Sequence, residues 1–491
     1  MKNRLKSVLA LVLVLCMLAL IGCGNSNSST ANNSQDTANQ NNQTPAAGQD
    51  TSTNITGTVV YAVRNYDMET EKKMVEEFNK VYPNITVQVV GFDGDLNEYL
   101  STQAASKTLP DVTYGWENLN YPISQGWVYP LDEFLAKDDE IKNVNAALMN
   151  SYKFGGKTYA VPTNYQFSGV MINLDLLEQL NLDVPSYTWT IDEFKNDLVK
   201  ATTDEYSGIN HLSGFDDVMS GVMSKKLHEM AYDPTDGKFK FTEGSWVKAI
   251  NLQKELKAIP GLVSDDLKND ELRKAGKEDD YQKKFGKDAD ALREGKVLMG
   301  FHGTWDLSWI RTMNYRYDLY PLPQDPAVGY KEAVHADHAF MMSTAKNPQA
   351  AFELLKWRSY GTKGILTRLD ILKNKVDADG KAAPDFFIPV SNDPEVVSAF
   401  KALDYVPEGV KYMFDNVDKG FRADYYKIVP DWDKVMNDII NPECENVRQG
   451  KADAAAVAPE LEQKANDALA KARQAFDAQL AKVQQNFNST N

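Results

Sequence analysis

Residues 58–117, TVVYAVRNYDMETEKKMVEEFNKVYPNITVQVVGFDGDLNEYLSTQAASKTLPDVTYGWE, decide the fold of this chain. Short apolar segments rich in β-branched residues alternate here with longer segments of helical periodicity. The pattern predicts strands at 58–63, 85–90 and 111–114, and helices at 67–82 and 95–106. Strands that alternate with helices at this spacing indicate a parallel sheet with crossover helices, and hence an α/β protein.

The residues that follow each predicted strand are the first candidates for a binding site. In open α/β sheets, ligands bind beyond the carboxyl ends of the strands. These positions hold polar and aromatic side chains, namely Arg64, Asn65, Tyr66, Asp93, Trp116 and Glu117. We therefore expect these side chains to contribute to a ligand site.

The N-terminus has the parts of an export signal. A basic start at residues 2–6 precedes an uninterrupted apolar run at 8–21, which has the length of a signal peptide rather than of a membrane span. The sequence LIGC at 20–23 then resembles a bacterial lipobox. This predicts a lipoprotein signal peptide at 1–22 and lipidation of Cys23, as by palmitate. The alternative is an ordinary signal peptide with an incidental cysteine.

A low-complexity segment follows the cysteine. Up to residue 54 it consists of Asn, Gln, Ser, Thr, Ala, Gly and Asp with one proline, which cannot bury enough surface to fold. We therefore expect 23–54 to be an acylated Cys23 followed by a disordered tether. The expected localisation is extracellular, at the outer face of the bacterial cytoplasmic membrane.

Length and composition limit the class of protein. The chain has 491 residues, 43% of them hydrophobic, which favours two lobes or domains with large cores. The formal net charge of −16 argues against a nucleic-acid partner, which would attract a basic surface. A mean hydropathy of −0.46 excludes a polytopic membrane protein, and three cysteines exclude a disulfide scaffold.

Several segments further along the chain carry a family resemblance. They are FGGKTYAVPTNYQFSGVMINLDLLEQL at 154–180, LREGKVLMGFHGTWDLSWI at 292–310 and HADHAFMMSTAKNPQAAFELLKWRS at 335–359. Together with the opening stretch, their order and spacing resemble the extracellular solute-binding proteins of bacterial ABC importers, in the sugar-binding, maltose-binding-protein-like family 1. The resemblance covers nearly all of residues 55–480. It implies an α/β, two-lobed periplasmic-binding-protein-like fold (type II), with a mixed, mainly parallel sheet flanked by helices in each lobe and a ligand cleft between the lobes.

The resemblance also implies lobe boundaries. Lobe one takes 55–163 plus 338–372, and lobe two takes 164–337 plus 373–491. Relative to the family, the chain has extra length near 264–290 and 370–430. An alanine-rich segment at 453–485 predicts a long terminal helix, expected to pack on lobe two.

Aromatic side chains are the candidates for stacking on a sugar. The apolar C–H face of a pyranose packs on an indole ring without requiring hydrogen bonds. Trp116 and Trp305 each follow a predicted strand, and Trp432 stands at a loop-to-helix junction where the family often has a cleft aromatic. The alternative for each of them is core packing.

Polar side chains near the same strand ends could bind sugar hydroxyls by charge-assisted hydrogen bonds. The full set of expected ligand-binding residues is Arg64, Asn65, Tyr66, Asp93, Trp116, Glu117, Asn164, Tyr165, Gln166, Trp305, Asp306, Asp337 and Trp432. The alternative for each polar member is a solvated loop position or a helix cap.

A metal site and a catalytic site are not expected. His335 and His338 would point to opposite faces of a strand, which disfavours joint ligation with His302. No carboxylate pair stands out as acid and nucleophile, and no cofactor motif is present in the sequence. We therefore expect that the protein binds no metal and no cofactor and that it is not an enzyme.

The expected function follows from the resemblance. It is a substrate-binding lipoprotein, acting as a monomer, that captures a carbohydrate, in particular an oligosaccharide, by closing about a hinge near 163–164 and 335–339. It would deliver the sugar to the transmembrane subunits of an ABC permease. The alternatives are a secreted, lipid-anchored glycan-degrading enzyme and a glycan-binding or sensing surface lipoprotein without a transport role.

Overall fold

The strands expected between residues 58 and 114 form one edge of the main sheet. In the computed structural model, β1 (Gly57–Arg64) pairs in parallel with both β2 (Ile85–Phe92) and β3 (Val112–Gly115). The connections are the expected helices, α1 (Met68–Val81) and α2 (Leu96–Ser106). The structure describes residues 54–490, so the predicted signal peptide, Cys23 and the tether lie outside the described residues.

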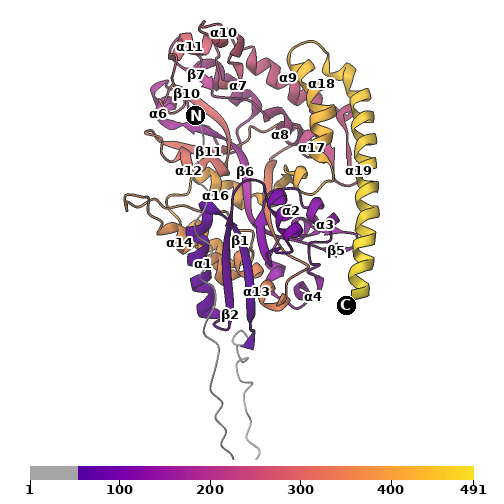
Figure 1. The fold of residues 1–491 in the computed structure, drawn as a ribbon. Coiled ribbons are helices and arrows are strands. Elements are labelled where there is room, and N and C mark those ends of the chain that lie inside the picture. Colours follow the sequence, from indigo (N-terminus) through magenta and orange to yellow (C-terminus); the bar gives the residue numbers. More distant parts are fainter. Residues whose placement is uncertain (1–53, 491) are drawn as a thin grey trace, which may run out of the picture. The chain divides into compact units, whose positions relative to one another are not determined.

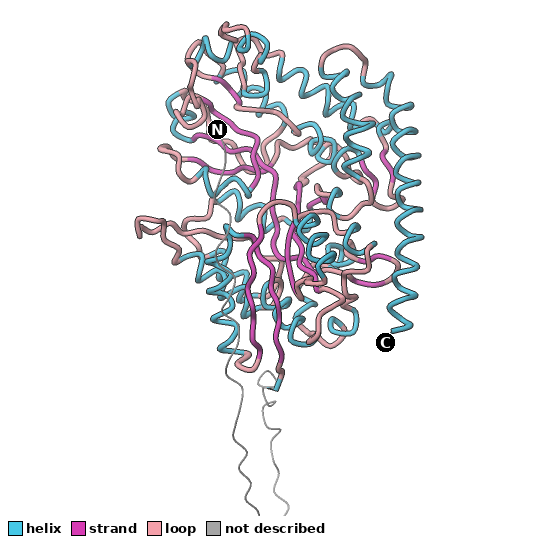
Figure 2. The backbone as a smooth tube through the Cα atoms, viewed as in Figure 1, coloured by secondary structure: helices cyan, strands magenta, loops and turns pink. Residues whose placement is uncertain are grey.

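Two long strands connect this group to a second group of strands. β12 (Glu332–Met341) pairs with β3 and with the first half of β6 (Val161–Asn173). The second half of β6 pairs with β10 (Val297–Gly303) and β11 (Tyr317–Pro321), and β10 pairs in parallel with β7 (Ser207–Ile209). The strand order is therefore β2-β1-β3-β12-β6-β10-β7, and the sheet passes through both lobes of the molecule. Figures 1 and 2 show β6 running from one strand group to the other.

Helices cover both strand groups. In lobe one they include α3 (Asn120–Ser124), α4 (Asp132–Leu135), α5 (Ala146–Asn150), α13 (Pro348–Arg358) and α14 (Thr362–Lys373). In lobe two they include α6 (Leu174–Gln179), α7 (Ile191–Ala201), α8 (Phe215–Val222), α9 (Ser245–Lys257), α10 (Asp270–Lys274), α11 (Asp280–Phe285) and α12 (Leu307–Ile310). The last part of the chain adds α15 (Pro394–Lys401), α16 (Glu408–Asp415), α17 (Trp432–Val435), α18 (Asn441–Arg448) and α19 (Ala454–Thr490). Three short pairings complete the strands, namely β4 (Lys153–Phe154) with β5 (Lys157–Thr158), β8 (Tyr232–Asp233) with β9 (Lys238–Phe239), and β13 (Gly420–Arg422) with β12.

The hydrophobic core continues from one strand group to the other. Val59 and Phe78 are fully buried in a cluster that also includes Leu319 of β11, while Leu198 and Phe215 are fully buried in a second cluster of lobe two. Apart from Leu319, these residues come from the apolar faces of β1, α1, α7 and α8, so the periodicity of the sequence accounts for them. The exact lobe boundaries given above stay predictions. Among residues 54–490, no helix combines the length and the apolar character needed to cross a membrane.

The terminal helix α19 packs on more of the molecule than the sequence predicts. Leu461 and Ala465 in its first half are buried on lobe two, as expected. In its last part, however, Leu480 is buried in a cluster of lobe one, and the Gln484 amide donates to the carbonyl of Gly155 at 3.1 Å. A helix of 37 residues rises about 55 Å, which is long enough to contact both lobes. Figure 1 shows α19 in yellow along one side of the body.

Candidate functional site

A cavity of about 720 Å³ lies between the two lobes. Its walls come from the loop after β1, the end of β3 and the turn after β10, and its floor from β6 and β12. Six of the predicted ligand-binding residues line it, namely Tyr66, Trp116, Asn164, Gln166, Trp305 and Asp337. The carboxyl-end argument therefore led to residues that line a cavity, and these six residues stay predictions as ligand contacts.

Three aromatic rings in this cavity are exposed to solvent. The exposed fraction is 70% for Tyr66, 37% for Trp116 and 47% for Trp305. Large apolar rings are normally buried, and when they gather in a concave site they commonly bind a ligand. Trp116 belongs to lobe one and Trp305 to lobe two, so the cavity has a ring on each side.

Arg64 and Glu117 hold the ring of Trp116 in place. The Arg64 guanidinium lies 3.8 Å from the centre of the ring and forms an ion pair with Glu117. The Glu117 carboxylate also accepts hydrogen bonds from the backbone N–H of Trp116 at 3.0 Å and of Leu96 at 3.1 Å. Both charged side chains are buried beside the ring rather than exposed in the cavity, so they position Trp116.

The ring of Trp305 rests on the backbone of Gly303. A Cβ atom at position 303 would come within 2.3 Å of the indole, so only glycine allows this approach. The His335 ring meets the indole edge-on at 5.0 Å. Burial lowers the pKa of His335 to about 4, so its imidazole is neutral at pH 7 and accompanies the ring without adding a charge.

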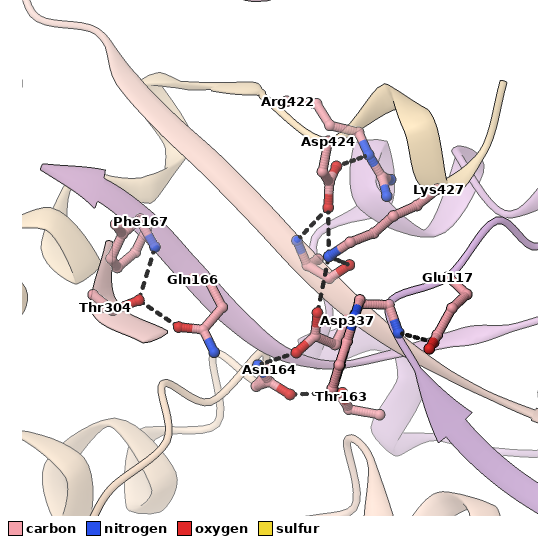
Figure 3. A network of polar contacts seen from close by, with 12 residues as sticks. Glu117, Thr163, Asn164, Gln166, Phe167, Thr304, Asp337, Arg422, Asp424 and Lys427 are labelled. Carbon is pink, nitrogen blue, oxygen red and sulfur yellow. Dashed lines mark hydrogen bonds and ion pairs between the residues drawn. The ribbon is translucent and has the colours of Figure 1, made fainter. Parts of the chain in front are cut away.

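A network of buried charges reaches the floor of the cavity through Asn164, Asp337 and Lys427. Asp337 accepts hydrogen bonds from the Asn164 amide at 3.1 Å and from the Lys427 ammonium at 2.8 Å, and Lys427 also pairs with Asp424 at 3.1 Å. Asp424 accepts in turn from the Nε atom of Arg422 at 2.5 Å. Figure 3 shows these five side chains, which we call the hinge network because Asn164 and Asp337 belong to the strands that join the lobes.

Electrostatics keep the hinge network fully ionised. Burial by itself would raise the pKa of the Asp424 carboxyl, but Arg422 and Lys427 outweigh it and hold this pKa well below its usual range. Burial would lower the pKa of Lys427, but Asp337 and Asp424 outweigh it and raise this pKa. The network thus has two cations and two carboxylates in close contact, which satisfies charges that could not be buried alone.

Gln166 presents the N–H groups of its side-chain amide beside this network. Its Oε1 atom accepts from the Thr304 hydroxyl, which accepts in turn from the backbone N–H of Phe167 at 3.0 Å (Figure 3). This bond fixes which end of the Gln166 amide is the donor. Its Nε2 group has no hydrogen-bond partner within residues 54–490 and lies at the cavity wall, where it could donate to a ligand.

Comparison with known proteins identifies the family. The sequence model of the bacterial extracellular solute-binding proteins matches residues 62–357. The chain belongs to this family. This match confirms the expected family, and the solved structures described next confirm the expected two-lobed fold.

Solved structures of solute-binding proteins have the same fold. An ABC substrate-binding protein from Listeria monocytogenes, in complex with cycloalternan, is 17% identical, with 84% of this chain and 99% of that chain covered and a TM-score of 0.62. The GacH receptor of Streptomyces glaucescens is 20% identical, with 85% of this chain and 98% of that chain covered and a TM-score of 0.60. The sugar-binding protein MalE of Xanthomonas citri is 16% identical, with 86% of this chain and 99% of that chain covered and a TM-score of 0.62.

Several predicted residues lie away from the cavity of this solute-binding protein. Asn65 and Asp93 bond to each other at 2.7 Å in a separate shallow depression. Asp306 accepts from His302 at 3.1 Å and from the Trp309 indole at 3.1 Å. Each of these side chains therefore already has a local partner, which the strand-end rule could not reveal.

Two predicted aromatic residues are also outside the cavity. Tyr165 is buried and points to the opposite face of β6, where it lines a second cavity of about 650 Å³. Trp432 is buried against Tyr232 and Phe239 in a core of lobe two. The loop-to-helix position of Trp432 is thus explained by packing.

The solute-binding protein also lines its cavity with residues that the sequence analysis missed. They are Asp67, Thr70, Tyr114, Thr304, Leu307, Ser308, His335, Arg358, Arg368, Leu372, Lys375, Asp385, Phe386, Phe387, Ile388, Tyr426 and Lys427. Many of them come from α14 and from the extra length near 370–430. One signal was available, because Arg368 interrupts the otherwise apolar stripe of Ile365, Leu369 and Leu372 on α14.

Proposed function

We propose that this solute-binding protein captures a saccharide in the cavity between its lobes and passes it to the transmembrane subunits of an ABC permease. The observation that carries the proposal is the gathering of three exposed rings, Tyr66, Trp116 and Trp305, around one cavity. A sugar ring held between indoles from opposite lobes buries its apolar face on both. The amides of Gln166 and Asn164 and the carboxylate of Asp337 supply polar contacts for hydroxyl groups.

Similar structures support a saccharide as the ligand. One of them contains cycloalternan, and the GacH receptor was solved in complex with acarbose. Both are carbohydrates or carbohydrate-like molecules. At 17% and 20% identity these proteins share the fold with this chain, while the exposed rings supply the argument from its own residues.

The cavity carboxylates suit binding better than glycoside hydrolysis. A hydrolase needs one carboxylic acid with a raised pKa to protonate the leaving oxygen. Asp337 has a pKa held below its usual value, since Lys427 and Asn164 outweigh the effect of its burial. Asp67 accepts from the Tyr114 hydroxyl at 2.5 Å, and Asp385 forms ion pairs with Lys375 and Arg311. We therefore favour a binding protein over the enzyme alternative.

The proposed function can be tested by a ligand screen. The purified protein is heated in the presence of neutral and acidic oligosaccharides from digested polysaccharides, and the melting temperature is recorded. We expect one structural class of sugar to raise it, by mass action on the folded state. Chromatography of the incubated sugar should recover it unchanged. Shortened products would support the enzyme, and a screen without any stabilising sugar would contradict the proposal.

Ligand binding should close the two lobes. A sugar that contacts Trp116 and Trp305 together favours the conformation in which both rings reach it, so binding shifts the population toward the closed form. Small-angle X-ray scattering should give a smaller radius of gyration at saturating ligand than without it. An unchanged scattering curve, with an open form still present at saturation, would contradict hinge closure.

We further propose that a lipid at Cys23 holds the protein at the outer face of the cytoplasmic membrane. The basis is the apolar run that ends in LIGC at residues 20–23. Cys23→Ala removes the thiol that would be acylated, so the variant should appear unprocessed or in the medium instead of in the membrane fraction. Cys444 is a free, buried thiol, so Cys444→Ala is the matched control and should leave fractionation unchanged. Equal membrane retention of the Cys23 variant would contradict the anchor.

A further inference from the structure

One cation in the cavity has no ion-pair partner among the described residues. Four cationic side chains line it, and three of them pair with a carboxylate: Arg358 with Glu71 at 2.8 Å, Lys375 with Asp385 at 3.2 Å and Lys427 with Asp337 at 2.8 Å. The fourth, Arg368 on α14, forms no ion pair and no hydrogen bond with any residue between 54 and 490. The paired cations show that this protein normally neutralises a charge placed here.

The surroundings of Arg368 do not compensate for the missing partner. Its guanidinium lies over the Phe387 ring, 4.7 Å from the ring centre. An aromatic face attracts a cation but accepts none of its directed N–H groups. The Nε and Nη1 atoms are shielded from solvent and have no acceptor among the described residues, so the Nη2 group is the one that a ligand reaches first. Burial, and next the like charge of Arg358, lower the pKa of Arg368, and they outweigh the opposite effects of Glu71, Tyr114 and Asp67, none of which forms an ion pair with it.

A shortage of carboxylates does not explain why the Arg368 guanidinium lacks a partner. The chain has a formal net charge of −16, so carboxylates are plentiful, yet none of those in residues 54–490 forms an ion pair or a hydrogen bond with Arg368. An arginine stays protonated even when buried, and its planar fork fits the two oxygens of a carboxylate, sulfate or phosphate. A hydroxyl group of a neutral sugar could accept one of these N–H bonds but could not balance the charge.

We propose that the cavity selects a saccharide that carries an acidic group, with that group bound by the Arg368 guanidinium. The acidic group is a uronate carboxylate or a sulfate or phosphate ester on the sugar. The rings of Trp116 and Trp305 pack against the sugar, and the Arg368 guanidinium pairs with its acidic group. The inference rests on the proposed function, because it names the ligand class for the same cavity.

The first test compares matched ligands on the unaltered protein. Titration calorimetry is carried out with uronate oligosaccharides from digested pectin and glucuronoxylan, with the same oligosaccharides after reduction of each carboxyl to a neutral alcohol, and with sulfated oligosaccharides. We expect an acidic series to bind roughly ten- to a hundredfold more tightly than its neutral counterpart, since a hydrogen-bonded charge pair is lost on reduction. Tighter binding of the uronate series would identify the acidic group as a carboxylate, and tighter binding of the sulfated series would identify it as an ester.

The second test uses variants of the arginine. Arg368→Gln should weaken binding of the acidic ligand by about ten- to a hundredfold and leave binding of its reduced counterpart nearly unchanged. Arg368→Lys keeps the charge but not the planar fork and should lie between the two. Arg316, which pairs with Asp175 and Glu178 on the exposed surface of lobe two, gives the matched control Arg316→Gln, expected to bind like the wild type.

Three results would overturn the proposal. Neutral saccharides could bind as tightly as their acidic counterparts, which would leave the proposed function intact and remove only the charge selection. Arg368→Gln could weaken both series equally, as expected if the arginine only supports the wall of the cavity. Binding of no saccharide in either series would reject the proposed function itself. If Arg368→Gln does not fold, the comparison of acidic and reduced ligands on the wild-type protein still tests whether the cavity selects an acidic group.

Discussion

Trp305→Ala should weaken saccharide binding by about ten- to a hundredfold and leave the melting temperature of the free protein nearly unchanged. Burial of a large apolar side chain against a ligand is worth roughly 1.5–3 kcal/mol, and each 1.4 kcal/mol is about a factor of ten in affinity. The indole is 47% exposed in the free protein, so its removal opens no internal cavity. Trp116→Ala should act in the same direction, because its ring faces the same space from lobe one.

Two further variants serve as controls for the Trp305 experiment. Tyr121 is an exposed ring outside this cavity, so Tyr121→Ala should change neither affinity nor stability much. Trp246 is fully buried in a core of lobe two, so Trp246→Ala should cost about 3–5 kcal/mol of stability. If Trp305→Ala behaved like the Trp246 variant and bound sugar normally once folded, the stacking role would be wrong.

Asp424→Asn should destabilise the folded protein by about 3–5 kcal/mol. The Asp424 carboxylate is 0% exposed and faces two cations, Arg422 and Lys427, as well as the backbone N–H of Ala336 at 2.8 Å. The amide keeps the shape but removes the charge, which leaves two buried cations with only Asp337 between them. Breaking a buried ion pair costs this much because the remaining charge is uncompensated. Urea unfolding at pH 7 measures the difference.

The same variant has a predicted pH dependence. The pKa of Asp424 is depressed in the folded protein, so its stabilising effect is complete above about pH 5 and is lost as the pH falls below about 4, where the unfolded chain binds the proton first. The gap between wild type and variant should therefore narrow on acidification. The exposed Asp139, paired with Lys142, gives the control Asp139→Asn, expected to have little effect. A constant gap from pH 7 to pH 3 would contradict the ionised network.

The part of the fold that local patterns determine was predictable from the sequence. The strands and helices between residues 57 and 115 follow from apolar periodicity, and their parallel pairing follows from the spacing. The position of α19 was only half predictable. Its alanine-rich pattern specifies a helix, whereas its contact with Gly155 depends on how far a straight helix of 37 residues reaches. Such long-range packing leaves no periodic signal in the sequence.

The cavity was predictable where strand ends alone define it. Tyr66, Trp116 and Trp305 were found because they follow β1, β3 and β10. Arg64 and Glu117 follow the same strands, but their mutual ion pair turns them inward, and pairing between distant residues cannot be read from either position. Phe387 and its neighbours lie in the irregular segment between α14 and α15, so no helix or strand gives a reference for the direction of their side chains.

The most direct measurement is a crystal structure of the protein with the saccharide that stabilises it in the screen. We expect the sugar to lie in the cavity between the lobes, in contact with the indoles of Trp116 and Trp305 and above the hinge network. A second cavity of comparable size, about 650 Å³, lies on the opposite face of β6 beside Tyr165, so the crystal offers a real alternative. A sugar bound there, with the rings of Trp116 and Trp305 left uncovered, would contradict the proposed binding site.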